Sequence, residues 1–344
     1  MSAARIWTIA RLELTQRLRS VGWYILLGVF ALVLLIVTVL TILAFAASAG
    51  GGGAAPGSWV FSAIVMLVLL LVVLISPTLS GSSINGDRDA ATLASVQTTL
   101  ASTGDILLGK LLGAVLTGTA FLLVSVPFLV VSMFAGVVRP DVLLVSLLVL
   151  AAEIVIVAAI GVGWSGLVSR PLFSVANTYL VIAALTVGTL IAFGLGGALI
   201  RTGTTYQYRL YDETGAPICD HWERSTSQTP RYDAVWGILA ANPFVVLADA
   251  TPSTFDERGY PTDLFSTLKV GIRSAQLPPQ NAPWDDCHPG VNIQKTPEQT
   301  VAATVPSWFV GLGIQLVLAA ALFAGAWART RTPARRLPPG TRIA

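Results

Sequence analysis

Four long stretches of the chain contain no charged residue, and this feature limits the possible folds more than any other. They occupy positions 20–86, 111–138, 171–200 and 299–328. A helix needs roughly 20 consecutive apolar residues to cross the hydrocarbon core of a bilayer. The first stretch can hold two such helices, separated by the glycine-rich residues 48–58, and each of the others can hold one. Only 11% of the residues are charged, against about 25% in a typical soluble domain, so the sequence indicates a membrane protein.

A further apolar run is interrupted by a single charge, Glu153. We therefore predict an all-α polytopic membrane protein with six transmembrane helices. The predicted helices span residues 21–47, 59–84, 110–136, 142–168, 173–200 and 305–328. The first follows basic residues, as a signal peptide would, but its apolar run is about twice the usual length of a signal-peptide core. We expect it to be retained.

Lys and Arg residues are unevenly distributed between the connections, and this asymmetry predicts the orientation of the chain. With both termini in the cytoplasm, the cytoplasmic segments hold twelve of these residues, while the short external loops hold Arg139 alone. The net charge of +3 then reflects membrane topology and gives no reason to expect a nucleic-acid partner. We expect a multi-pass protein of the cell (cytoplasmic) membrane that contacts lipid.

The one long polar connection, residues 201–304, is external in this orientation and can form a small extracellular domain between the fifth and sixth helices. It contains both cysteines, Cys219 and Cys287. Outside the cytosol a disulfide between them is the simplest expectation. Because each cysteine has a histidine nearby, a zinc site is one alternative. Two unpaired thiols are the other. The spacings match no known zinc module, and we expect no metal.

Both ends of the chain are basic. Residues 1–20 predict a cytoplasmic amphipathic helix that lies in the membrane interface with its arginines at the headgroups. Its apolar face is formed by Trp7, Ala10, Leu14 and Leu18. The alternative is a helix that only anchors the topology. Residues 329–344 form a basic cytoplasmic tail with several prolines, which we expect to be solvated or bound to headgroups.

Glu153 lies near the middle of the fourth predicted helix, where an unpaired carboxylate is strongly disfavoured. Two interpretations are open. The carboxyl group contacts substrate or carries a proton in a transport pathway, or it forms a structural hydrogen bond with Gln315, which we expect at a similar depth in the sixth helix. In both cases we expect Glu153 to face the protein interior or the pathway and not lipid.

Residues 104–110, Gly-Asp-Ile-Leu-Leu-Gly-Lys, match a phosphate-binding loop except at the last position. The Ser or Thr that holds Mg²⁺ in such loops is missing, and no buried strand precedes the segment. We therefore expect no ATP site and no cofactor in this chain. Hydrolase motifs and intramembrane zinc motifs are also missing from the sequence, so we do not expect an enzyme.

Two motifs connect the chain to a known family. Residues 84–93 read Ile-Asn-Gly-Asp-Arg-Asp-Ala-Ala-Thr-Leu and lead into Asp-Ile-Leu-Leu-Gly-Lys at 105–110, and Ala-Asn-Pro-Phe at 241–244 precedes the last span. With the amphipathic N-terminal helix and the predicted spans, this arrangement resembles the permease subunits of type 2 ABC (ATP-binding cassette) exporters. In that family the stretch after the second span typically reads acidic-Arg, then Gly-Thr-Leu, a Pro-containing turn and Ile-Leu-Leu-Gly-Lys. This chain has Ala91 where Gly is common and Leu100 where Pro is frequent.

The resemblance implies that two permeases, identical or related, form a pathway for a hydrophobic, lipid-like, drug or peptide substrate. ATP and Mg²⁺ would be bound by a separate nucleotide-binding ATPase subunit that contacts residues 85–100. We expect a short helix in this segment, with Ala90, Leu93, Ala94 and Gln97 on one face. The candidate coupling residues are Asp87, Arg88, Leu93, Ala94 and Gln97. The candidate pathway residues are Glu153 and Gln315.

Two other functions are open. One is a non-transporting membrane sensor or assembly platform that acts through the extracellular domain and needs no ATPase. The other is a secondary transporter driven through Glu153, which is disfavoured because the sequence has one central charge and no visible inverted repeat.

Overall fold

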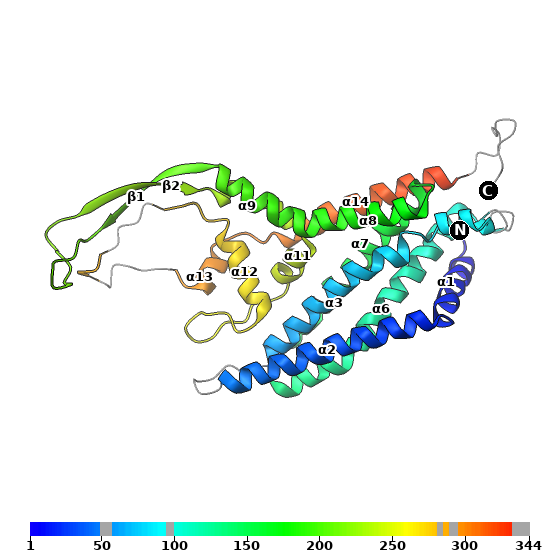
Figure 1. Cartoon of the computed structure of the whole chain (residues 1–344), viewed down its shortest axis with the longest axis horizontal. Coiled ribbons are helices and arrows are strands. Elements are labelled where there is room, and N and C mark those ends of the chain that lie inside the picture. The colour runs from blue at the N-terminus through cyan, green and yellow to red at the C-terminus, as the bar shows by residue number, and fades with distance from the viewer. Residues whose placement is uncertain (49–56, 94–99, 281–284, 289–294, 332–344) are drawn as a thin grey trace. The chain divides into compact units, whose positions relative to one another are not determined.

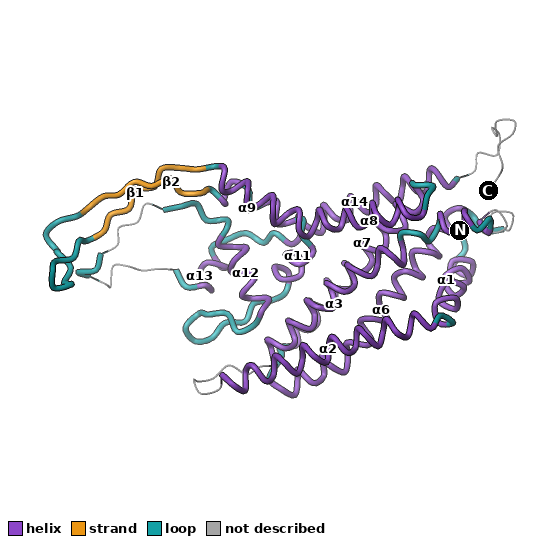
Figure 2. Tube along the Cα trace, viewed as in Figure 1, coloured by secondary structure: helices purple, strands orange, loops and turns teal. Residues whose placement is uncertain are grey.

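The computed structural model describes residues 1–48, 57–93, 100–280, 285–288 and 295–331. Most of these residues are helical (Figures 1 and 2). Within them, six helices are long and apolar enough to cross a membrane. These are Val21–Ala47, Gly57–Asp89, Thr103–Ala135, Pro140–Leu167, Pro171–Leu199 and Trp308–Thr330. Their number and order agree with the predicted multi-pass membrane protein.

The chain divides into two compact units, residues 1–185 with 309–344 and residues 186–308. The first unit contains α1 (Ala3–Leu18), α2 (Val21–Ser48), α3 (Gly57–Ser80), α4 (Asn85–Asp89), α6 (Thr103–Ala135), α7 (Pro140–Leu167), α8 (Pro171–Ala183) and nearly all of α14 (Trp308–Thr330).

Helix α7 is central to the first unit, because it packs against α3, α6 and α8 and has buried residues along most of its length. It also approaches α14 closely through two glycines. A Cβ atom at Gly163 would lie 2.7 Å from Leu322 Cβ, and one at Gly166 would lie 2.5 Å from Ala326 Cβ. Small residues allow such close contact between membrane helices, where dispersion contacts replace the hydrophobic effect as the source of packing energy.

Helix α6 begins at Thr103, several residues before the predicted start at residue 110. A capping box explains the difference. The Ser102 side chain accepts a hydrogen bond from the Asp105 backbone, and the Asp105 carboxylate accepts one from the Ser102 backbone, so both helix-end donors are satisfied. The predicted boundary at residue 110 follows from the uncharged stretch, which begins at residue 111.

The second unit contains a π-helical turn (Ala184–Gly188, mostly within the unit), α9 (Thr189–Leu199), β1 (Arg201–Tyr208), β2 (Glu223–Pro230), a 3-10 turn (Tyr232–Ala234), α10 (Gly237–Ala240), α11 (Pro243–Ala250), α12 (Leu264–Ser274) and α13 (Pro297–Ala302). The predicted external segment, residues 201–304, lies within this unit. Strands β1 and β2 form an antiparallel hairpin in which Arg201 is opposite Pro230. It is the one sheet among the described residues.

Buried charges hold the helices of the second unit together. Arg273 of α12 donates to Asp249 of α11 at 2.6 Å, and Asp249 also accepts hydrogen bonds from the backbone and hydroxyl of Ser307. Lys269 of α12 donates to the carbonyl of Thr251. Burial lowers the pKa of Lys269 to about 8. These contacts give the unit a polar core of its own.

Candidate functional site

Lys110 is the centre of a charged cluster that joins three helices. Its Nζ atom lies 2.6 Å from Glu13 Oε1 of α1 and 2.6 Å from Asp87 Oδ2 of α4. Lys110 itself belongs to α6, and its side chain is buried. A lysine can be accommodated in an apolar helix when carboxylates satisfy its charge and its N–H donors. We call Glu13, Asp87 and Lys110 the charge cluster.

Helix α1 packs along α6 next to the charge cluster. A Cβ atom at Gly109 would lie 2.7 Å from Ile9 Cβ, so glycine permits the close contact, and Ala10 is fully buried. The expected apolar face of α1 is therefore divided. Ala10 packs inside the protein, whereas Trp7 and Leu18 are exposed and are free to contact lipid.

Polar contacts attach both ends of α1 to the spans. The Ser2 backbone donates to Asp105 Oδ1 at 2.9 Å, and Arg5 Nη1 lies 3.7 Å from the other oxygen of the same carboxylate. Near the other end, Arg17 donates to the Leu79 carbonyl at 2.7 Å. Burial lowers the pKa of Arg17. Helix α1 is thus linked to α3 and α6 as well as to the charge cluster.

Helix α4 is attached to the end of α7. The backbone N–H groups of Ile84 and Asn85 donate to Ser165 Oγ at 2.8 and 3.2 Å. The Asn85 side chain donates to the Val168 carbonyl at 3.3 Å. Asp87 joins the same short helix to α6 through Lys110. A displacement of α4 would therefore act on α6 and α7 together.

The chain turns sharply after α4. The helix ends at Asp89, and Ala91 has φ of 55°, in the left-handed region that favours glycine because a Cβ atom is crowded there. Arg88 is partly exposed, and residues 89–92 are exposed. We call residues 88–92 the exposed strip. The expected single helix face with Ala90 and Leu93 is not formed in the described part, since the turn at Ala91 changes the direction of the chain.

Leu93 is 2% exposed and belongs to the core of the first unit. It shares a cluster with Ile84, Ile106, Leu107, Val162 and Ala326. The expectation that Leu93 contacts a partner therefore needs correction, because its side chain is already covered by the chain's own helices. Asp87 is engaged with Lys110, and Ala94 and Gln97 lie outside the described residues.

Glu153 and Gln315 meet in the interior of the first unit. Each side chain is 1% exposed, and the Gln315 side chain interacts with the Glu153 carboxyl group. Neither Glu153 oxygen has a hydrogen bond of standard geometry within the described residues. The prediction that Glu153 faces the interior is confirmed. A buried carboxyl group that is incompletely satisfied is costly, which makes it a candidate for function.

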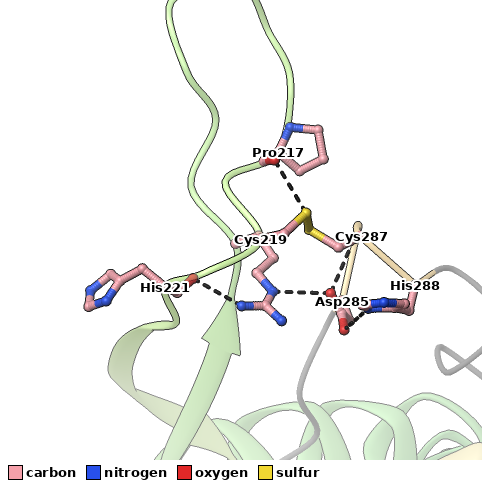
Figure 3. The surroundings of a disulfide bond; sticks show 7 residues. Pro217, Cys219, His221, Asp285, Cys287 and His288 are labelled. Carbon is pink, nitrogen blue, oxygen red and sulfur yellow. Dashed lines mark hydrogen bonds and ion pairs between the residues drawn. A yellow bond between two sulfur atoms is a disulfide. The ribbon is translucent and has the colours of Figure 1, made fainter.

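Cys219 and Cys287 form a disulfide, with their Cα atoms 5.8 Å apart, as predicted (Figure 3). Both sulfurs are therefore unavailable as zinc thiolates. The two histidine rings point to opposite sides of the disulfide in Figure 3. His221 pairs with Glu223, and His288 pairs with Asp285.

Arg209 supports the disulfide region. Its Nε atom donates to Asp285 Oδ1 at 3.1 Å, and its guanidinium lies 3.6 Å from the centre of the Trp222 ring. The hydrogen bond from Arg209 lowers the pKa of Asp285 to about 2. The Asp285 carboxylate also accepts from the Cys287 backbone at 3.1 Å. This network fixes one half-cystine through a charge and aromatic contact that the sequence did not predict.

Asn242 connects α11 to the π-helical turn before α9. Its Nδ2 atom donates to the Thr186 carbonyl at 2.8 Å and to Thr189 Oγ1 at 3.0 Å. Its Oδ1 atom accepts from the Phe244 backbone and so caps α11, while Pro243 occupies the first turn, where a proline is tolerated. A π-helical turn shifts the regular helix hydrogen bonds, and Asn242 satisfies a carbonyl group there. The Asn-Pro motif thus has a structural role.

The chain matches no protein-family model and no curated protein.

Proposed function

We propose that this chain is the membrane-spanning permease subunit of an ATP-driven exporter, and that a separate subunit binds ATP and Mg²⁺ and hydrolyses the ATP. The observation that carries the proposal is the charge cluster, in which Lys110 of a candidate span contacts Glu13 of α1 and Asp87 of α4. A permease that lacks an ATPase site must receive work through a surface that is both exposed and firmly connected to its spans. The exposed strip directly follows Asp87 and meets both conditions.

The backbone at Ala91 supports the resemblance to type 2 exporter permeases. In those proteins glycine is common at the corresponding position. Here the residue has φ of 55°, a conformation that glycine adopts more readily than any other residue. The preference of the family for glycine thus has a physical explanation in this chain, even though alanine occupies the position.

In the proposed orientation the exposed strip, α1 and the tail after α14 face the cytoplasm, in accord with the excess of Lys and Arg in these segments. Residues 201–304, the part of the second unit that follows α9, then lie outside the cell, where cellular reductants do not reach the Cys219–Cys287 disulfide. Two permeases, either two copies of this chain or this chain with a relative, would form the pathway in the cell membrane. Glu153 and Gln315 are the candidate polar groups of that pathway, for a hydrophobic, lipid-like, drug or peptide substrate.

A single added side chain in the exposed strip tests the proposal. We expect Ala90→Trp to block the ATPase subunit sterically while the spans remain inserted, because Ala90 is exposed. The matched control is Val137→Trp. Val137 is 88% exposed and lies between α6 and α7, at the ends of these helices away from Lys110 and Ser165. Each tagged variant is purified from its native membrane in mild detergent, bound ATP-binding cassette subunits are identified by mass spectrometry, and ATP-dependent transport is measured in vesicles.

The proposal requires that an ATPase subunit co-purifies with the wild type and with the Val137→Trp control, and that it is lost from Ala90→Trp. If the wild type functions with no ATPase subunit, or if Ala90→Trp keeps both the subunit and full transport, the proposal is wrong.

The second candidate, a sensor or assembly platform, is favoured by the separate polar core and disulfide of the second unit. It predicts function without an ATPase and loss of function when the second unit is altered.

A further inference from the structure

The second unit contains an open pocket of about 500 Å³ between α9, the β1–β2 hairpin and α12. This volume is within the range of about 300–1,000 Å³ that is typical of small-molecule sites. Its lining includes Phe193, Tyr206, Tyr232, Gly271, Ala275 and Leu277. Among the described residues that line the pocket, none is charged and none is a histidine. The pocket therefore offers aromatic and aliphatic surface with no counter-charge for an ion.

Phe193 and Tyr232 form an aromatic wall of the pocket, which is held in place by ring and backbone contacts. The rings of Phe193 and Tyr232 have centroids 5.2 Å apart. Tyr232 packs directly on Gly197 of α9, where a Cβ atom would lie 2.1 Å from the ring. The Arg231 backbone N–H group reaches the carbonyls of Gly197 and Ile200, at 3.1 and 2.8 Å. A wall fixed in this way costs little further ordering when a ligand binds.

Three of the five polar side chains in the lining form hydrogen bonds within the chain. The hydroxyl groups of Tyr206 and Thr229 lie 3.2 Å apart and share a hydrogen bond. Ser274 donates its hydroxyl to the Val270 carbonyl at 2.7 Å. A sugar or a peptide would lose its own hydration on entering and find few free polar partners, a loss that disfavours such ligands.

We propose that this pocket binds one acyl chain of a lipid or lipid-like molecule. Besides the uncharged lining, the position of Phe193 leads to this assignment. Phe193 belongs to α9, the last part of the candidate span Pro171–Leu199, so the aromatic wall continues the apolar surface of a helix that is able to cross a membrane. The span itself contains no charged residue, so an acyl chain that lies along it meets no charge of the helix. The assignment rests on the proposed function in one respect, because it identifies the pocket as a site for an exported lipid-like substrate.

The pocket offers a filling variant that should not disturb the fold. Gly271 of α12 lines the pocket, and nothing lies within 4 Å of a Cβ atom placed there. Gly271→Leu therefore adds a side chain that can occupy the pocket, and leucine favours a helix more than glycine does. Gly237→Leu is the matched control, because Gly237 also has nothing within 4 Å of its Cβ position and is not part of the lining.

The experiment uses the full chain in detergent micelles with two photoreactive probes, phosphatidylcholine carrying a diazirine in its acyl chain and diazirine-labelled palmitate. Labelled peptides are identified by mass spectrometry. We expect labelling around Tyr232 and Gly271, reduced at least tenfold in Gly271→Leu and unchanged in Gly237→Leu. Labelling of the spans should be equal in all three proteins and serves as the internal control. Labelling by palmitate alone would show that the bound acyl chain comes from a free fatty acid. Labelling by both probes would show that the pocket recognises the acyl chain whatever its headgroup.

Labelling confined to the spans would overturn the assignment, and the tyrosines would then be an aromatic belt at the membrane surface. Equal labelling of the pocket in Gly271→Leu and the wild type would also overturn it. The two proposals fail separately. Pocket labelling without a co-purified ATPase would support the acyl-chain site and contradict the exporter function. A co-purified ATPase without pocket labelling would support the exporter function and contradict the acyl-chain site.

Discussion

Replacing Lys110 with Met tests whether the charge cluster holds α1, α4 and α6 together. Methionine keeps much of the length and the apolar body of lysine but has no charge. The Glu13 and Asp87 carboxylates, each 2.6 Å from Nζ in the native chain, would then be close to one another without a cation. The variant would lose two attractions and gain a repulsion.

Burial sets the expected magnitudes. The Lys110 side chain is 3% exposed, and removing one partner of a buried ion pair costs about 3–5 kcal/mol. The Asp87 side chain is 37% exposed, and an exposed pair contributes about 0–1 kcal/mol because water screens it. We therefore expect Lys110→Met to lower the free energy of unfolding by about 3–5 kcal/mol, and Asp87→Asn by about 1 kcal/mol at most. Glu13→Gln should lie between these values, since the Glu13 side chain is 17% exposed.

The assay is equilibrium unfolding of the purified chain in mixed micelles, with increasing SDS and circular dichroism as the readout. The triple variant with Glu13→Gln, Lys110→Met and Asp87→Asn should recover most of the loss, because it leaves no unpaired charge. Arg139→Gln is the control, because the Arg139–Asp141 pair is exposed on both sides and should contribute about 1 kcal/mol or less. The reasoning is refuted if Lys110→Met unfolds like the wild type, or if the triple variant is as unstable as Lys110→Met alone.

Four other predictions concern single positions or pairs. Ala91→Gly should raise the free energy of unfolding by roughly 1 kcal/mol in the same SDS titration, because glycine has no Cβ atom to strain at this positive φ; a decrease would contradict the geometry. Glu153→Gln should keep the fold and the contact with its neighbour, whereas Glu153→Leu should impair transport or assembly; normal vesicle transport and normal assembly of Glu153→Leu would remove Glu153 from the candidate pathway. Replacing Cys219 and Cys287 together with Ser should destabilise the second unit by about 4 kcal/mol, from the entropy of a chain closed over 68 residues, and limited proteolysis should cleave this unit before the spans. Burial lowers the pKa of Lys269 to about 8, against 10.5 for an unperturbed lysine. Between these two pH values the unfolded chain binds more protons than the folded chain, so the free energy of unfolding of the second unit should rise with pH across this window. Lys269→Met should abolish the rise.

The number of candidate spans could be predicted from sequence because an uncharged stretch is a local property of the chain. The start of α6 could not, because the cost of placing Lys110 in a span depends on two carboxylates that are far away in sequence. Glu13 and Asp87 lie 97 and 23 positions before Lys110 in the sequence. Their pairing is a long-range contact, for which composition and periodicity carry no signal.

The disulfide could be predicted because the chain has two cysteines, both in the same long polar segment. The elements that surround it could not. The contact of Arg209 with Trp222 and Asp285 joins β-hairpin and loop residues with no regular spacing. The role of Asn242 was partly visible, since Asn-Pro is a common start of a helix, but its bond to the π-helical turn at Thr186 depends on packing.

Leu93 illustrates the limit of helical periodicity most directly. The prediction placed it on one face with Ala90 by assuming an uninterrupted helix, but the positive φ at Ala91 breaks that register, and nothing about an alanine signals such a break. The broken register lets Leu93 reach Ile106, Val162 and the other members of its core cluster. A charged substitution at Leu93 would therefore place a carboxylate in the core, where its burial is costly, and loss of transport would follow from instability alone. Ala90→Trp, on the exposed side of the same turn, separates loss of a partner from loss of the fold, and that is why it carries the test of ATPase coupling.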